Sequence, residues 1–172
     1  MKTITIDLFS NDIDKAIKEI YEYSKSIENK MNILRQRLAD EIANEASTNF
    51  SGAVVDDVIN GSVKRAEVTV SVNEIGTISV VVADGKDAVW CEFGAGVYHN
   101  GGAGSSPHDK GADLGFLIGT YGDGHGAHEV WGYYDESKNL VLTHGTPATM
   151  PMYNAAKAVA DRAISIAKEV FA

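Results

Sequence analysis

The chain has 172 residues, of which 44% are hydrophobic and 23% charged, the proportions of a globular protein. We expect one domain, 1–172, large enough to bury a core without disulfides or structural metal. No run of eighteen apolar residues occurs, which excludes a transmembrane helix and any membrane partner. The N-terminus lacks the apolar stretch of a signal peptide, and Cys91 is the single cysteine. We therefore expect a chain made in the cytoplasm, with no internal disulfide.

The net charge is −9, and most of it lies in the middle of the chain. Residues 51–150 contain 13 acidic and five basic residues. A surface that binds phosphates needs the opposite sign, so the charge argues against DNA binding as the main activity. The charge still allows a negatively charged lining around a passage through which DNA slides.

The first part of the chain predicts a short strand and then a long helix. Residues 3–8 alternate apolar and polar side chains, as a half-buried strand does. Asn11 is a suitable N-cap for a helix that ends near Gly52, with Gly52 itself in the left-handed C-terminal position. A break is expected near residues 28–30. The residues that repeat at helical spacing are Ile13, Ile17, Ile20, Ile27, Met31, Leu34, Leu38, Ile42 and Ala46.

Two segments of alternating valines and isoleucines follow, residues 65–71 and 77–83, with a turn expected at 73–76. We expect them to form a β-hairpin that lies under the long helix. Residues 94–126 then contain 11 of the 17 glycines and show no periodicity, which indicates a long loop. A loop of this length in a compact domain is usually functional.

A second hairpin is expected from residues 129–134 and 139–143. Pro151 then starts the last helix, because a proline in the first turn costs no hydrogen bond. The apolar side of that helix consists of Met152, Ala155, Val159, Ala163, Ile166 and Val170. These elements predict an α+β fold: a long N-terminal amphipathic helix and a C-terminal helix packed on a small antiparallel sheet, with a Gly/His-rich loop, 97–128, inserted.

All five histidines lie between residues 99 and 144, with aspartates among them. Imidazole and carboxylate groups suit zinc or another divalent metal. The candidate ligands are His108, Asp123, His125 and His128. They lie in a glycine-rich loop, whereas a His-Glu-x-x-His site places its ligands on a helix. A metal-binding or metal-dependent hydrolase module is therefore kept as the alternative to a polar loop, and no cofactor is expected.

Other catalytic patterns are weaker. Cys91 stands between bulky apolar neighbours and beside Glu92, which favours a buried structural thiol. The glycines at 122–126 lack the third glycine of a dinucleotide loop and the strand-to-helix frame around it. Ser105 with His108 and Asp109 has no strained turn at the serine. We therefore predict no catalytic residues.

Aromatic side chains also gather in the glycine-rich half of the chain. Aromatic residues with glycine are common at protein contact surfaces, where they bury a large area with few rotatable bonds. Tyr98, Phe116 and Tyr121, together with His125, are the predicted contact residues of the loop. Trp90 and Phe93 are expected in the core.

Two short motifs carry a resemblance to a known family. The first is Trp90-Cys-Glu-Phe-Gly-Ala-Gly96, and the second leads from Gly145 through Pro147 and Pro151 into the last helix. In this order, across nearly the whole chain, they resemble the head–tail joining proteins of long-tailed bacteriophages, the gene-product-ten-like tail-completion or neck family. The residues that match are Glu92, Phe93, Gly94, Gly96, Gly145, Pro147, Pro151, Met152, Tyr153 and Ala156.

The resemblance implies a structural virion protein of the neck and not an enzyme. Members of that family form a ring, six-fold by family expectation, at the head–tail interface. Their partners are copies of themselves, a head-completion or connector protein, and a tail tube or tail terminator protein, with DNA only as passing cargo. The implied location is the virion, after synthesis in the host cytoplasm. Glu92, Phe93, Gly94, Gly96, Pro147 and Pro151 would then be structural residues of the family motif.

Overall fold

The structure is a computed structural model of the whole chain, and it describes residues 10–94, 110, 113–114 and 130–172. The order of elements is α1 (Ser10–Gly52), β1 (Thr69–Ile75), β2 (Ile78–Asp84), α2 (Ala88–Phe93), β3 (Trp131–Tyr134), β4 (Leu140–Thr143) and α3 (Pro151–Phe171). This is an α+β fold, as the sequence predicts. The strand predicted at residues 3–8 lies outside the described residues.

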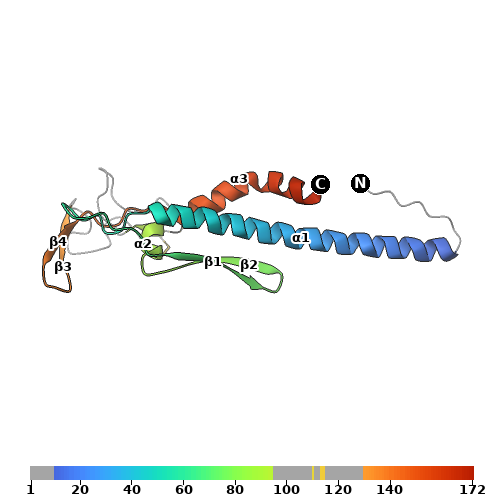
Figure 1. Cartoon of the computed structure of the whole chain (residues 1–172), viewed down its shortest axis with the longest axis horizontal. Helices are drawn as coiled ribbons and strands as arrows, with labels where there is room; N and C mark the ends of the chain where they lie inside the picture. The colour runs from blue at the N-terminus through green and yellow to red at the C-terminus, as the bar shows by residue number, and fades with distance from the viewer. Residues whose placement is uncertain (1–9, 95–109, 111–112, 115–129) are drawn as a thin grey trace.

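Helix α1 runs along most of the length of the molecule (Figure 1). It runs without interruption for 43 residues, so the break predicted near residues 28–30 is wrong. Gly52 is its last helical residue and does not have the predicted left-handed conformation. The stripe of apolar residues continues across the predicted break, which favours continuous helix because the same face stays in register.

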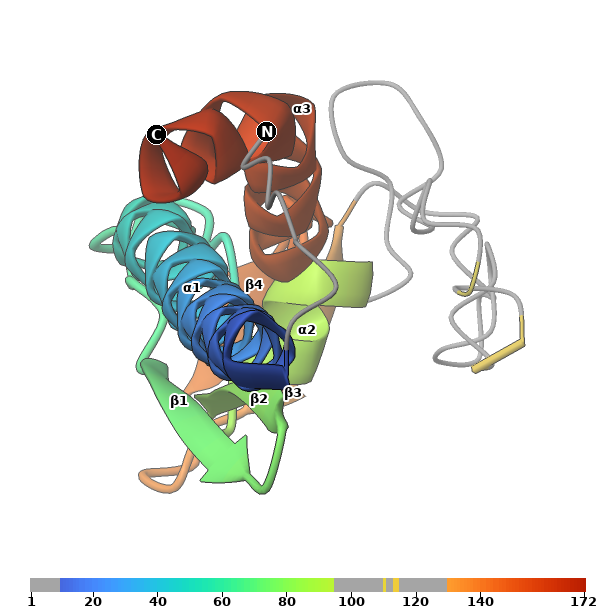
Figure 2. The ribbon, with the colours of Figure 1, turned by 90° about the vertical axis from the view of Figure 1, so that its right-hand side faces the viewer.

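The second half of α1 lies between two other elements. Helix α3 packs along one side and the β1–β2 hairpin along another, as the end-on view shows (Figure 2). On α1, Ala46 is fully buried, and on α3 Ala155, Val159 and Ile166 are buried. Thus α3 packs on α1 and α2, while the hairpin packs on α1. The hairpin under the long helix is therefore as predicted.

Ion pairs reinforce the contact between the two long helices. Arg37 bonds Glu169 of α3 at 2.6 Å and Glu41 of its own helix at 3.3 Å. Arg162 of α3 approaches Glu41 at 3.7 Å and Glu45 at 3.8 Å. These side chains are partly exposed, so each pair contributes little, and the buried apolar face holds the helices together.

The β1–β2 hairpin pairs Thr69 with Asp84 and Ile75 with Ile78. Its turn is therefore at residues 76–77 and not at 73–76, and β1 has the predicted length but begins and ends four residues later than the predicted strand at 65–71. Gly76 has a φ of 60°, which a two-residue hairpin turn requires and glycine adopts at little cost. Arg35 of α1 holds the hairpin end by bonding the carboxylate of Glu74 and, at 2.8 Å, the hydroxyl of Ser79.

The second hairpin, β3–β4, forms as predicted and lies at the end of the molecule that α1 reaches with its C-terminus (Figure 1). The segment after α1 ties it to the rest of the chain. His144 N–H donates to the carbonyl of Asp57 at 2.9 Å, and Ile59 N–H donates to the carbonyl of Leu142 at 2.8 Å. The Tyr133 hydroxyl bonds the carboxylate of Asp56.

A small core joins the end of α1 to α2. It consists of Phe50, Ala53, Val55, Ala88 and Cys91, covered by Ala66, Val68, Val70, Ala83 and Met152. Helix α2 was not predicted, because six residues are too few to show a helical period. Asp87 precedes it and is buried, and its carboxylate accepts a hydrogen bond from Glu67 N–H at 3.0 Å.

Candidate assembly interface

The Glu-Phe-Gly motif lies at the junction between α2 and α3. Glu92 is only 8% exposed. Its carboxylate accepts hydrogen bonds from two backbone N–H groups in the first turn of α3, Met152 at 2.8 Å and Tyr153 at 3.0 Å. The first N–H groups of a helix have no partner inside it, and the helix dipole favours an anion there. Glu92 therefore caps α3 from a position about sixty residues earlier in the chain.

The backbone beside Glu92 holds the same junction. The carbonyl of Cys91 accepts hydrogen bonds from Thr149 N–H at 2.9 Å and Met150 N–H at 3.2 Å. Met150 has a left-handed backbone, and Pro151 follows at the first helical position. This conformation turns the chain sharply into α3, so that the free N–H groups of its first turn meet the carboxylate.

Gly94 ends α2 with a φ of 80°, and its N–H donates to the carbonyl of Trp90 at 2.7 Å. A residue with a side chain would be strained at this φ, which explains why the motif has a glycine at this position. Phe93 and Pro147 are half-buried, whereas Trp90 is 36% exposed, so the prediction that Trp90 lies in the core is wrong. The motif residues in the described part of the chain thus form the α2–α3 junction and no catalytic arrangement.

All of the predicted contact and metal residues lie outside the described residues, and so does the motif residue Gly96. The contact and metal residues are Tyr98, His108, Phe116, Tyr121, Asp123, His125 and His128. Among the residues that the structure does describe, no group of three or more His, Cys, Asp or Glu side chains could hold a metal ion. No helix in this described part is long and apolar enough to cross a membrane.

Cys91 is fully buried in the small core, with an exposed fraction of 0%. Burial, together with the negative charges of Asp87 and Glu92, raises the pKa of its thiol to about 11. A thiol with such a pKa is protonated at neutral pH and is a poor nucleophile. Cys91 is therefore a core residue.

Several apolar side chains are exposed on the first half of α1. The hydrogen bonds and ion pairs that connect α1 to other described elements begin at Lys30, whose ammonium group bonds the carbonyl of Phe171. Residues 10–29 project beyond the end of α3 (Figure 1). On this projection Ile13, Ile17 and Ile20 are 41%, 60% and 52% exposed. They share one face, and we call them the apolar ridge.

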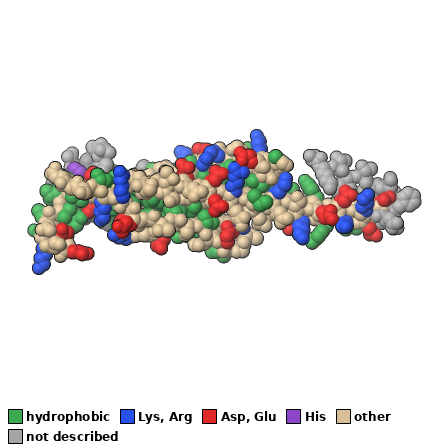
Figure 3. Space-filling model, in the orientation of Figure 1, with side chains coloured by type: hydrophobic (Ala, Val, Ile, Leu, Met, Phe, Trp, Pro, Cys, Tyr) green, Lys and Arg blue, Asp and Glu red, His purple; other side chains and the backbone are tan. Residues whose placement is uncertain are grey.

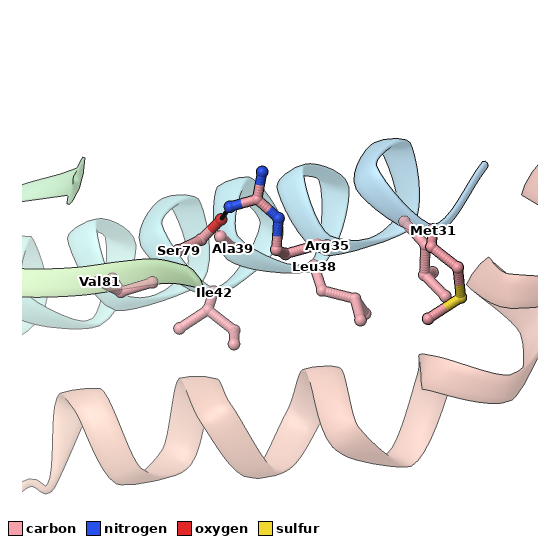
Figure 4. Close-up of a pocket in the computed structure, with 8 residues that line it drawn as sticks. Met31, Arg35, Leu38, Ala39, Ile42, Ser79 and Val81 are labelled. Atoms are coloured by element: carbon pink, nitrogen blue, oxygen red, sulfur yellow. Dashed lines mark hydrogen bonds between the residues drawn. The ribbon is translucent and has the colours of Figure 1, made fainter. Parts of the chain in front are cut away.

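The stripe of α1 continues from the ridge into an open slot beside β2. The slot has a volume of about 330 Å³, and Figure 4 shows the side chains that line it. They are Met31, Leu34, Arg35, Leu38, Ala39, Ile42, Ser79 and Val81. Arg35 supplies the one charge, and its Nε–H is buried without a hydrogen-bond partner among the residues described.

Apolar side chains are also exposed at the opposite end of the molecule, on the β3–β4 hairpin. Leu140 and Tyr134 are examples, and the space-filling view shows hydrophobic groups at this end (Figure 3). One feature of the sequence does indicate the ridge, although the ridge was not predicted. The stripe on the long helix is about twice as long as the last helix, so α3 alone could not cover it.

Comparisons with protein-family models, with curated proteins and with solved structures found no match.

Proposed function

We propose that this chain is a structural protein of the neck of a long-tailed bacteriophage and has no enzymatic activity. In this role, copies of the chain form a ring at the head–tail interface. The ring joins a head-completion or connector protein to a tail tube or tail terminator protein, with DNA passing through it. The chain is made in the host cytoplasm and works in the virion.

The observation that carries this proposal is the uncovered apolar surface of α1. Ile17 and Ile20 are more than half exposed on a helix whose other half is well packed. Exposed contiguous apolar surface on a folded protein marks a site of association. A ring needs two different complementary faces on each copy, and the elongated molecule presents apolar surface at each end.

The family motifs support the proposal from a second direction. Glu92 and Pro151 form a structural junction that fixes where α3 starts. A structural role for these residues fits a family whose motif carries no catalysis. The net charge of −9 also suits the lining of a channel through which DNA slides freely, because like charges repel.

Electron microscopy of lysates from the encoding phage, with this gene deleted, tests the proposal. We expect filled heads and finished tails lying apart, and restored virions when the gene is supplied in trans. Intact virions without the gene product would refute the neck role. In that case, elemental analysis of untagged protein tests the metal-binding alternative, which requires near-stoichiometric metal that is lost when His125 and His128 are replaced.

A further inference from the structure

We propose that Asn60 is a site of spontaneous covalent modification, at which the side chain loses ammonia and the backbone becomes an isoaspartyl linkage. The modified backbone loosens the hold of the segment after α1 on the β3–β4 hairpin. The proposal concerns the chemistry of one exposed turn and does not depend on the neck role.

Asn60 is the third residue of a turn formed by residues 58–61. The N–H of Gly61 donates to the carbonyl of Val58 at 3.4 Å, a long and therefore weak hydrogen bond. Asn60 has a φ of 58°, a left-handed conformation that asparagine adopts more often than most residues. Its side chain is exposed and makes no hydrogen bond to the residues that the structure describes. The side-chain amide can therefore rotate toward the backbone of the next residue.

Gly61 makes this asparagine reactive. Without a Cβ, its backbone nitrogen is unshielded and rotates against the Asn60 Cγ with little steric resistance. A Cβ at position 61 would lie 2.6 Å from Cγ1 and 3.1 Å from Cβ of Val58, so the turn requires the glycine. Among the asparagines in the described part of the chain, Asn60 is the one that precedes a glycine. The same glycine thus closes the turn and exposes it to the reaction.

The reaction needs no reagent besides water. The backbone nitrogen of Gly61 loses its proton and attacks the Asn60 Cγ, forming a nitrogen–carbon bond and a five-membered succinimide ring. The bond from Cγ to Nδ2 breaks, and this nitrogen takes up a proton and leaves as ammonia. Water then opens the ring at one of its two carbonyls. Opening at Cγ gives aspartate, and opening at the backbone carbonyl gives isoaspartate, with one added negative charge in either product.

The residues just before the turn hold the β3–β4 hairpin. The N–H of Ile59 donates to the carbonyl of Leu142 at 2.8 Å, and the N–H of His144 donates to the carbonyl of Asp57 at 2.9 Å. An isoaspartate at position 60 adds one carbon to the backbone directly after Ile59. The turn then no longer closes with the same geometry, and the residues before it lose their alignment with β4. We therefore expect the hairpin to open more often by local unfolding.

Ageing of the purified full-length chain tests the modification. One sample is kept folded and a second is kept unfolded in urea. Tandem mass spectrometry with electron-transfer fragmentation distinguishes asparagine, aspartate and isoaspartate at position 60 and separates this site from Asn100-Gly101. The matched internal control is Asn139, an exposed asparagine that precedes leucine and whose amide donates to Asp135 at 3.3 Å. The variant Asn60→Gln, whose longer side chain does not form the five-membered ring, is the second control.

We expect Asn60 in the folded chain to convert at no less than about a tenth of its rate in urea, because the turn opens locally. The rate should rise about tenfold for each unit of pH above neutral, since the deprotonated nitrogen is the nucleophile. Asn139 and the residue introduced by Asn60→Gln should remain intact. A folded chain in which Asn60 persists while it converts in urea, or in which Asn139 converts equally fast, would overturn the proposed site.

Hydrogen exchange on the separated isoaspartyl form tests the effect on the hairpin. We expect the amides of Ile59 and His144 to exchange at least about tenfold faster than in the unmodified chain. The variant Asn60→Asp carries the same charge on a normal backbone and should exchange like wild type. Unchanged exchange in the isoaspartyl form would overturn the loosening of the hairpin, and equal acceleration in Asn60→Asp would overturn the role of the lengthened backbone.

Discussion

Replacement of Glu92 by glutamine isolates the role of the motif carboxylate. The wild-type carboxylate satisfies two N–H groups at the start of α3 while almost completely buried. Glutamine has nearly the same shape but only one oxygen. It can keep one of the two hydrogen bonds, and its NH₂ group then faces the second backbone N–H, which is left without an acceptor.

The expected cost combines two losses. A hydrogen bond to a charged group contributes roughly 1.5–3 kcal/mol, and an anion at a partly buried helix N-terminus up to about 2 kcal/mol. Because glutamine keeps one bond in neutral form, we expect Glu92→Gln to lower the free energy of unfolding by about 2–4 kcal/mol. At about 2–4 °C per kcal/mol for a chain of this size, the Tm falls by about 5–15 °C.

Urea denaturation followed by far-ultraviolet circular dichroism measures this change. The control is Glu136→Gln, an exposed residue in the β3–β4 turn, which should stay within about 0.5 kcal/mol of wild type. If Glu92→Gln also stayed within that range, the carboxylate would not be the cap of α3, and the structural reading of the motif would be wrong.

Three further predictions concern other positions, each checked by urea denaturation. Gly85→Ala should destabilise the fold by about 2–4 kcal/mol, since its φ is 148° and an added Cβ would lie 2.3 Å from the carbonyl oxygen of Glu67; Gly52→Ala, with open space around it, should lose nothing, and equal effects would contradict this reasoning. Lys138→Gly should stabilise by about 0.5–1 kcal/mol, because the exposed Lys138 has a φ of 63°, and a loss of stability would argue against that turn. The pKa of the Cys91 thiol is raised from 9.0 to about 11, so the stability that the neutral thiol contributes is complete below pH 9 and is lost as the pH rises to 11. Over this pH range, the free energy of unfolding of Cys91→Ala should therefore fall by roughly 2–3 kcal/mol less than that of wild type. An unchanged pH dependence would refute the assignment.

The sequence predicts the long elements well because their periodicity extends over many turns. The apolar stripe on α1 identifies the helix, but it cannot tell which part of the stripe is covered within the chain. Asn29 lies within the break expected at residues 28–30 and has a weak helix preference. That preference costs only a few tenths of a kcal/mol, which a continuous helix easily outweighs.

The junction at Glu92 could not be derived from local pattern. Helix α2 is stabilised by contacts with segments about sixty residues away, and Glu92 meets its partners only through the tertiary fold. The motif identifies Glu92 as a residue of interest, but it does not predict that the carboxylate caps α3. The hairpin turn was misplaced because Asn73 and Glu74 suit a turn locally, while Arg35 of α1 keeps Glu74 at the end of the extended strand.

Because α1 is one unbroken helix, its two halves should differ in how readily their backbone opens. Amide protons from Leu38 to Phe50, beneath α3 and the hairpin, should exchange with solvent only when the whole fold opens, whereas those from Ile13 to Ile20 should exchange through local fraying. A single helix would then show a gradient of protection along its axis. Any partner that covers the ridge would flatten that gradient, so hydrogen exchange along α1 would report folding at one end and docking at the other.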